Sequence, residues 1–138
     1  MVMWTHNEKP MLSHKDFTDD VIGFIYRITY SDGRMYIGSK LIRAVRKLKP
    51  TKAQLAIRKN YSRKEMVDLS FVKYAGSSKN TKGLEIVSKE IIEVCSDKIN
   101  LRYCETKHLF RNDVLCGELY LNDNINGTYF RNRITKGY

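Results

Sequence analysis

Residues 23–38 constrain the fold of this chain more than any other stretch. They read GFIYRITYSDGRMYIG, in which two aromatic and β-branched runs flank the pair Asp32-Gly33. Such runs favour β-strands, and an Asp-Gly pair between them is a strong signal for a tight hairpin turn. A hairpin alone is only marginally stable in water. We therefore expect the rest of the chain to supply a further strand or a covering helix.

Two later segments have patterns that suit this purpose. β-Branched residues in the second half of residues 84–95 predict a third strand, and a helix is predicted from Asn100, a suitable N-cap, to Arg111. At about 100° per residue, one face of this helix carries Leu101, Cys104, Glu105, His108 and Leu109. The expected fold is α+β, with a small, mainly antiparallel three-stranded sheet flanked by helices.

Glu105 is the unusual member of that helical face, because its neighbours there are mostly apolar. Burying a lone carboxylate costs several kcal/mol unless the group is paired, hydrogen-bonded or bound to a metal ion. The alternative is a partly exposed glutamate at the margin of the stripe, paired with a nearby cation. The periodicity supports the two interpretations equally.

A length of 138 residues suits one domain. Residues 1–20 show no periodicity, and we interpret them as an irregular N-terminal arm that packs through Trp4 and Phe17. Residues 21–138 are predicted to form the single domain itself.

Within that domain, residues 40–70 are predicted to form a basic helical insertion. Apolar residues at positions 41, 45 and 48 share one face of a helix over residues 39–49, which Pro50 ends. Capping-box patterns at residues 51–54 and 62–65 predict the starts of two more short helices. Residues 71–78 are interpreted as a short extended segment that enters a loop running to Gly83.

The charge of the chain indicates a nucleic-acid partner. Its 25 Lys and Arg against 15 Asp and Glu give a net charge of +10, the electrostatic footprint of a nucleic-acid binder. Basic residues that merely solvate the surface are the alternative. We predict contacts to nucleic-acid phosphates from the cations of the basic region and the segment after it: Arg43, Lys47, Arg58, Lys59, Arg63, Lys64 and Lys73.

Other function classes receive less support. No apolar run is long enough to cross a membrane, and the first 20 residues lack the apolar stretch of a signal peptide, so we expect an intracellular protein. Three cysteines without a Cys-x-x-Cys pair indicate reduced thiols. A zinc site is an alternative of low weight, because its ligands would be irregularly spaced: Cys95, Cys104, His108 and Cys116. His6 and His14 match no ligand motif, and we interpret them as exposed.

Two tripeptides in the hairpin resemble the motif of the GIY-YIG nucleases. Phe24-Ile25-Tyr26 and Tyr36-Ile37-Gly38 lie about ten residues apart, with Phe24 in place of the usual first glycine. Over roughly residues 23–126 the later elements follow the family order, and residues 74–78 are similar to a loop of small phage-encoded members.

The resemblance implies a catalytic set of Tyr26, Tyr36, Arg46, Glu105 and Asn122. It implies that Glu105 binds a divalent cation, for which Mg²⁺ (or Mn²⁺) suits a carboxylate ligand. The tyrosine hydroxyls would face the scissile phosphate, and the arginine would stabilise its growing charge. Arg43 and Arg58 are alternatives to Arg46, and Asn124 to Asn122. Pro50 occupies the position of a family His or Tyr, so a proton shuttle is expected elsewhere, at Tyr61 or Lys73.

The function implied is a metal-dependent DNA endonuclease that hydrolyses phosphodiester bonds, in homing, restriction or DNA degradation. A homodimer is expected if both strands are cut together. The alternative function is a non-catalytic nucleic-acid-binding module, or regulator, on the same fold.

Overall fold

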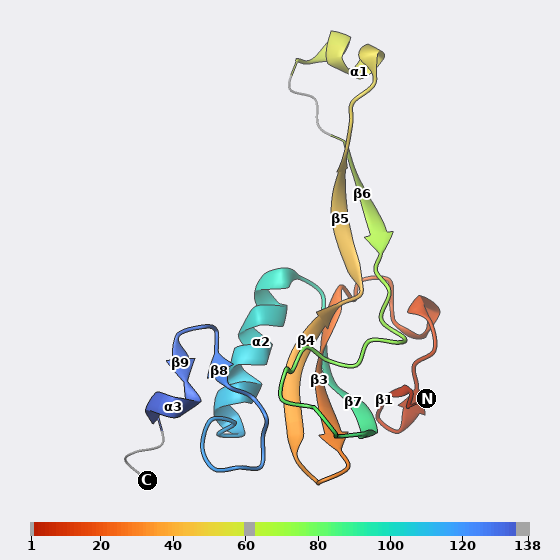
Figure 1. The fold of residues 1–138 in the computed structure, drawn as a ribbon. Helices are drawn as coiled ribbons and strands as arrows, with labels where there is room; N and C mark the ends of the chain where they lie inside the picture. The colour runs from red at the N-terminus through yellow and green to blue at the C-terminus, as the bar shows by residue number, and fades with distance from the viewer. Residues whose placement is uncertain (1, 60–62, 135–138) are drawn as a thin grey trace.

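A five-stranded sheet with the strand order β2-β1-β7-β3-β4 forms the centre of the computed structural model, which describes residues 2–59 and 63–134 (Figure 1). The expected hairpin is formed by β3 (Gly23–Tyr30) and β4 (Met35–Leu41), which pair antiparallel. Gly33 in its turn has φ +88°, which only glycine adopts without strain. The expected third strand is β7 (Ile86–Cys95), antiparallel to the other edge of β3. The α+β class and these three strands are confirmed.

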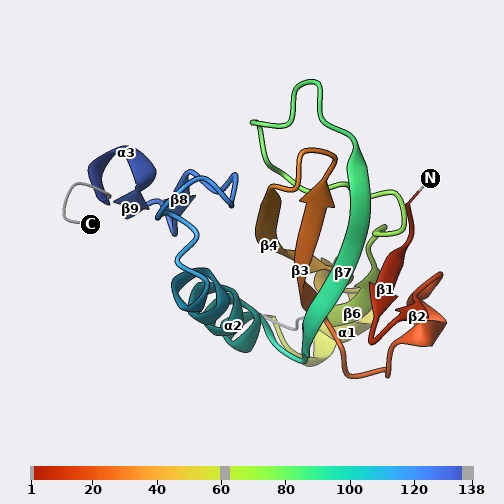
Figure 2. The same ribbon diagram turned by 90° about the horizontal axis from the view of Figure 1, so that it is seen from below.

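The N-terminal arm is not irregular, and the prediction of a three-stranded sheet was too small. The arm forms β1 (Trp4–His6), β2 (Lys9–Pro10) and a 3₁₀ turn, η1 (His14–Asp16). Because β1 runs parallel to β7, the sheet is mixed (Figure 2). The predicted packing of Trp4 and Phe17 is confirmed: both are buried, and Trp4 Nε1 donates a hydrogen bond to the Phe71 carbonyl at 2.9 Å.

The hairpin contributes to two hydrophobic cores, because successive side chains of a strand point to opposite faces. On one face Phe24, Tyr26 and Ile28 pack with Trp4 and Phe71. On the other face Ile25 and Ile37 pack against α2 (Lys98–Arg111). This helix begins earlier than predicted, because Asp97 is its N-cap and accepts a hydrogen bond from the Asn100 backbone N–H at 2.7 Å.

The predicted helical insertion over residues 40–70 is wrong for most of its length. β5 (Arg43–Leu48) and β6 (Arg63–Asp68) form a separate antiparallel ribbon that projects from the sheet, with α1 (Lys52–Ile57) near its far end (Figure 1). The expected apolar helix face has no core to bury it, since Val45 is exposed. The capping box of residues 51–54 is confirmed, whereas residues 63–65 belong to a strand. We call residues 43–48 and 63–68 the ribbon.

The segments that flank the hairpin complete the fold. Residues 71–74 are a turn rather than an extended segment, because the Tyr74 N–H bonds the Phe71 carbonyl. Near the C-terminal end lie β8 (Asn124–Ile125), β9 (Tyr129–Phe130) and α3 (Arg131–Ile134). The chain before β8 runs along the outer edge of β4, where Met35 exchanges backbone hydrogen bonds with Leu119 and Leu121. Among the described residues, no helix is long and apolar enough to span a membrane.

Candidate active site

Tyr26 and Tyr36 lie side by side on one face of the β3–β4 hairpin, with ring centroids 6.2 Å apart. Gly38 makes this arrangement possible, because it is the cross-strand partner of Tyr26. A Cβ atom at Gly38 would lie 2.5 Å from the Tyr26 hydroxyl and 3.1 Å from the Tyr36 ring. The glycine of the second tripeptide is therefore required by the tyrosine of the first.

A loop from a distant part of the chain covers these tyrosines. The Tyr74 and Tyr26 hydroxyls share a hydrogen bond of 3.3 Å, and the Tyr36 hydroxyl and Ser77 Oγ share one of 3.2 Å. Gly76, between the two, has φ +85°, and a Cβ there would lie 2.8 Å from Ile28 Cδ1. The sequence pointed to this loop only through the resemblance. Tyr74 and Ser77 were not among the predicted site residues.

The two motif tyrosines differ in solvent exposure, but both are protonated at neutral pH. Tyr26 is 0% exposed, whereas Tyr36 is partly exposed. Burial raises the pKa of Tyr26 far above its ordinary value, and the hydrogen bond with Tyr74 raises it further. Burial also raises the pKa of Tyr36, and the negative charge of Glu105 adds to that increase, although the Ser77 hydrogen bond opposes it. Both phenols are therefore neutral hydrogen-bonding groups at neutral pH.

Glu105 lies on the α2 side of the same strand. Ser39 Oγ donates a hydrogen bond of 2.6 Å to Glu105 Oε2, which explains how a carboxylate is kept in a largely apolar helix face. Glu105 is partly exposed, as the alternative interpretation expected, but the cation pairing of that interpretation is not found in residues 2–59 and 63–134. The same described residues offer no hydrogen bond to Oε1. The site thus wraps around β4, with the tyrosines on one face and Glu105 on the other.

Asn122 holds the β4 edge next to Tyr36. It is 4% exposed; its Nδ2 donates to the Ile37 carbonyl at 2.8 Å, and its Oδ1 accepts from the Ile37 N–H at 3.2 Å. The amide therefore continues the ladder that Leu119 and Leu121 form with Met35. In the structure, both hydrogen bonds of the amide to Ile37 are made with the backbone of β4. The alternative, Asn124, is exposed, and its side chain accepts from the Gly127 N–H in a turn.

Lys40 is a cation beside the hydroxyl groups of Tyr26, Tyr36, Tyr74 and Ser77, which we call the hydroxyl cluster. Its ammonium nitrogen lies 5.0 Å from the centroid of the Tyr74 ring, and it shares the tyrosine face of β4 because its position alternates with that of Ser39. The prediction of site residues missed both Ser39 and Lys40. Their position directly after Gly38 is the signal by which they could have been found.

The structure does not bring Arg46 to the tyrosines. Arg46 lies on the ribbon, is exposed and forms an ion pair with Glu65 across the two strands. Its predicted place in a helix after the hairpin does not exist, because the chain continues as β5. Arg58 lies after α1 beyond the ribbon, and Tyr61 lies outside the described residues.

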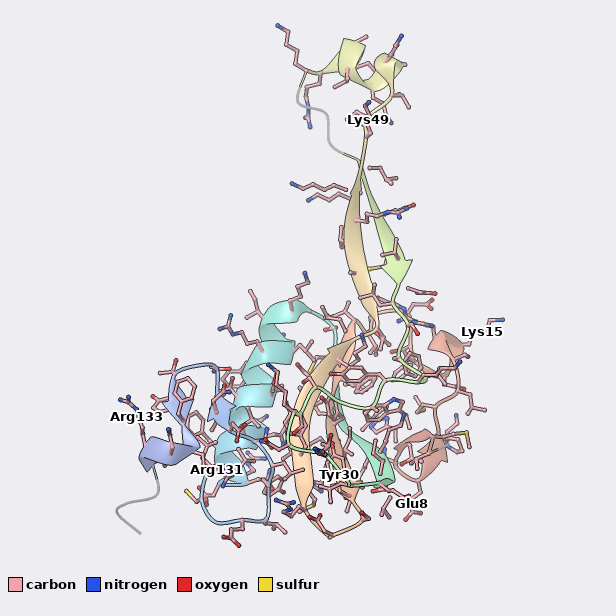
Figure 3. The ribbon with its side chains drawn as sticks, in the orientation of Figure 1. Glu8, Lys15, Tyr30, Lys49, Arg131 and Arg133 are labelled. Carbon is pink, nitrogen blue, oxygen red and sulfur yellow. The ribbon has the colours of Figure 1, made fainter. Side chains whose placement is uncertain are left out.

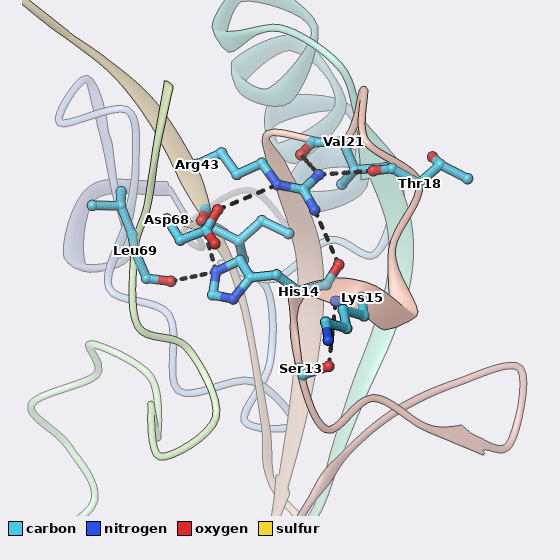
Figure 4. Close-up of polar contacts among 9 residues, drawn as sticks. Ser13, His14, Lys15, Thr18, Val21, Arg43, Asp68 and Leu69 are labelled. Atoms are coloured by element: carbon cyan, nitrogen blue, oxygen red, sulfur yellow. Dashed lines mark hydrogen bonds and ion pairs between the residues drawn. The ribbon is translucent and has the colours of Figure 1, made fainter. Parts of the chain in front are cut away.

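Arg43, which was predicted to contact DNA, lies buried at the base of the ribbon. It is 7% exposed, and its guanidinium donates to the carbonyls of Thr18, Val21 and His14 and pairs with Asp68 (Figure 4). His14 is half-buried rather than exposed, with Nε2 close to the carbonyls of Ile42 and Leu69. Arg43 therefore ties the base of the ribbon to the N-terminal arm.

The remaining predicted DNA-binding cations are distributed over three places. Lys47 and Lys64 are exposed on the ribbon, Arg58 and Lys59 are exposed after α1, and Lys73 is exposed just before Tyr74. Arg63 lies in β6, and its side chain is outside what the structure describes. Most of these predicted cations are thus separate from the hydroxyl cluster.

Three of the four candidate zinc ligands, Cys95, Cys104 and His108, take part in other contacts. His108 Nε2 lies 2.7 Å from Glu93 Oε2, and burial, together with Cys104, raises the pKa of the Cys95 thiol to about 12. Within the described part of the chain, no three His, Cys, Asp or Glu side chains are grouped to hold a metal ion. A zinc centre built from these residues therefore receives no support.

A protein-family model matches most of the chain. Residues 4–125 match the family model described as "Putative endonuclease segE, GIY-YIG domain". The matched range runs from β1 to β8 and includes the ribbon. No curated protein and no solved structure matches the chain.

Proposed function

Because this chain belongs to the GIY-YIG endonuclease family, we propose that it is a metal-dependent endonuclease that hydrolyses phosphodiester bonds in double-stranded DNA. One observation carries the proposal. The stretch Gly38-Ser39-Lys40 of β4 brings a tyrosine pair, a cation and a hydrogen-bonded carboxylate to one place. These are the group types that phosphodiester hydrolysis uses to bind a phosphate and to place a divalent cation.

The donor set of Glu105 fits Mg²⁺ or Mn²⁺. Carboxylate oxygen is the ligand type that Mg²⁺ prefers, and this ion is often held by one or two carboxylates together with substrate phosphates and waters. Ser39 occupies Oε2, and Oε1 accepts no hydrogen bond from the described residues. When bound, such an ion lowers the pKa of a water molecule and stabilises charge on the phosphate.

The tyrosines are proposed to act as hydrogen-bond donors. Since burial raises the pKa of both phenols, each keeps its proton at neutral pH, and Tyr36 can donate a hydrogen bond to a phosphate oxygen or orient the attacking water. Tyr36 is the one that solvent reaches. Tyr26 is a positioning residue in this arrangement, because its covered hydroxyl contacts Tyr74 rather than the surface.

Lys40 takes the role that the resemblance assigned to an arginine. Its position beside Tyr74 places a positive charge on the tyrosine face, where it attracts the phosphate and offsets the negative charge that develops in the transition state. A lysine acts here as a point charge, without the bidentate fork of an arginine.

Plasmid cleavage tests the proposal. Wild-type protein should convert supercoiled plasmid to nicked or linear DNA in Mg²⁺ or Mn²⁺, and EDTA should stop the reaction. Glu105→Gln keeps an oxygen that can accept from Ser39 and removes the charge that holds the cation. We expect it to lose at least about 100-fold in rate, because metal-derived stabilisation amounts to several kcal/mol.

Glu118→Gln is the matched control, since it makes the same substitution at an exposed glutamate outside α2. It should cleave like the wild type. Equal cleavage by the wild type and Glu105→Gln, or cleavage by neither, would refute the enzyme and favour the non-catalytic DNA-binding alternative.

A further inference from the structure

The ribbon and the segment at its far end form a second arm, distinct from the N-terminal arm, without a core of its own. None of the side chains described in residues 45–59 and 64–68 is buried. Figure 3 shows the arm projecting from the sheet, with Lys49 near its far end. An isolated two-stranded hairpin is only marginally stable in water. The arm is therefore expected to gain order by contacting something outside this chain.

The charge of the arm indicates the chemical class of that partner. Residues 47–64 contain seven Lys and Arg and no Asp or Glu. The acidic residues of the ribbon, Glu65 and Asp68, lie nearer its base, where they pair with Arg46 and Arg43. The outer part of the arm is thus a concentrated positive charge that suits a polyanion.

One face of the ribbon carries unneutralised charge next to apolar side chains. Cross-strand partners share a face, and the register pairs Val45 with Met66 and Lys47 with Lys64. We call these four residues the lysine face. Val45 is 58% and Met66 54% exposed. Two lysines directly opposite each other repel and destabilise an isolated ribbon, so their juxtaposition points to a bound anion.

On the opposite face Arg46 lies across from Glu65 and forms an ion pair with it, and Arg63 lies across from the apolar Leu48, so neither of these two pairs sets one cation opposite another. The lysine face also borders a groove of about 350 Å³ whose lining includes Val45, Met66 and Lys98 at the start of α2. Glu105 follows Lys98 by seven residues on the same helix, about 10 Å along its axis. A polyanion gripped by the lysine face therefore passes close to the candidate active site.

The dimensions of the ribbon match those of a DNA groove. Its six paired residues per strand span about 20 Å at roughly 3.3 Å per residue. The major groove of B-DNA is about 12 Å wide and accepts a two-stranded β-ribbon. The major groove of an RNA duplex is deep and too narrow for side chains to read. Shape therefore favours DNA over double-stranded RNA.

From these observations we infer that the lysine face inserts into the major groove of duplex DNA. Lys47 and Lys64 contact phosphates on the two sides of the groove, and Val45 and Met66 pack against base edges such as thymine methyl groups. This inference rests on the proposed function, because it assigns the DNA-gripping element of the same enzyme.

Salt-dependent binding tests the inference directly. The experiment compares Glu105→Gln, which prevents cleavage, with the same variant that also carries Lys47→Ala/Lys64→Ala. Both proteins are titrated with a labelled duplex at several salt concentrations. Loss of two phosphate contacts should reduce the magnitude of the slope of log K against log salt concentration by about 2. The control Lys9→Ala/Lys15→Ala removes the same charge from exposed lysines of the N-terminal arm and should leave that slope unchanged.

Three further readouts test the fit of the ribbon to the groove, its base contacts and its lysine pair. The wild-type protein should bind a DNA duplex at least tenfold more tightly than an RNA duplex of the same sequence. Val45→Thr and Met66→Thr should leave average affinity nearly unchanged and alter the distribution of cleavage positions. The double lysine variant should be no less stable than the wild type in the absence of DNA, because a repulsive pair is removed.

Three results would overturn the inference: an unchanged salt slope for Lys47→Ala/Lys64→Ala, equal binding of the RNA duplex, or binding of anionic vesicles in place of DNA. Failure of the proposed function gives a different pattern. A protein that shows the reduced slope but never cleaves keeps the groove-binding ribbon and loses catalysis, whereas one that cleaves with an unchanged slope keeps catalysis and loses the ribbon.

Discussion

Replacing Asn122 with alanine separates a positioning role from a catalytic one. The substitution removes both hydrogen bonds to Ile37 and leaves a backbone N–H and carbonyl without partners at a buried site. Each unsatisfied buried group costs about 1–3 kcal/mol. Because a water molecule can occupy part of the space that the amide leaves and bond one of these groups, we expect a total loss of about 2–4 kcal/mol in the free energy of unfolding.

Urea denaturation followed by circular dichroism measures this loss. With an m-value near 2 kcal/mol/M, the midpoint should fall by about 1–2 M. Asn124→Ala is the matched control, since Asn124 is exposed and makes a local turn contact; it should shift the midpoint much less. An unchanged midpoint for Asn122→Ala together with lost cleavage would refute the reasoning and make Asn122 a group that contacts the substrate.

Other consequences concern the tyrosine cluster and the two faces of the sheet. Gly38→Ala should cost about 1–3 kcal/mol of stability and abolish cleavage, because its methyl group overlaps the Tyr26 hydroxyl; wild-type stability and activity would contradict the packing described. In an alkaline titration followed by ultraviolet absorbance, Tyr36→Phe should remove a late-ionising phenol, because the pKa of Tyr36 is raised; loss of an early-ionising one would contradict this. Burial opposes the ionisation of Glu93, but the hydrogen bond from His108 keeps its pKa below the ordinary 4.5. The hydrogen bond to ionised Glu93 therefore stabilises the fold above the ordinary pKa, and this stabilisation is lost as the pH falls through the lower pKa of the folded state. In His108→Gln, the free energy of unfolding should therefore decrease less over this acidic range than it does in the wild type.

The sequence predicted the parts of the fold that local patterns specify. Aromatic and β-branched runs around an Asp-Gly turn predicted β3 and β4, and the helical period predicted α2 to within three residues of its start. The same reasoning failed for residues 40–70. An exposed ribbon has no buried face, so the spacing of its apolar residues reports no packing, and the periodicity at 41, 45 and 48 was accidental.

The candidate site was only partly predictable, for a different reason. Tyr26, Tyr36 and Glu105 were identified through the resemblance, and the structure brings them around β4. Tyr74 reaches Tyr26 from 48 positions away, and the hydrogen bond between Ser39 and Glu105 spans 66 positions. Contacts at such separations depend on the assembled sheet and leave no local pattern. Arg46 was chosen by spacing along a helix that does not form.

The central claim is that Glu105 and the hydroxyl cluster act as one site across β4. The most direct measurement is a double-mutant cycle of Tyr36→Phe and Glu105→Gln, read as the single-turnover rate of DNA cleavage in Mg²⁺. Groups that act as a unit give strongly non-additive losses, so the double variant should be no slower than about the slower single variant. Additive losses would contradict a shared site, and full activity of either single variant would remove that residue from it.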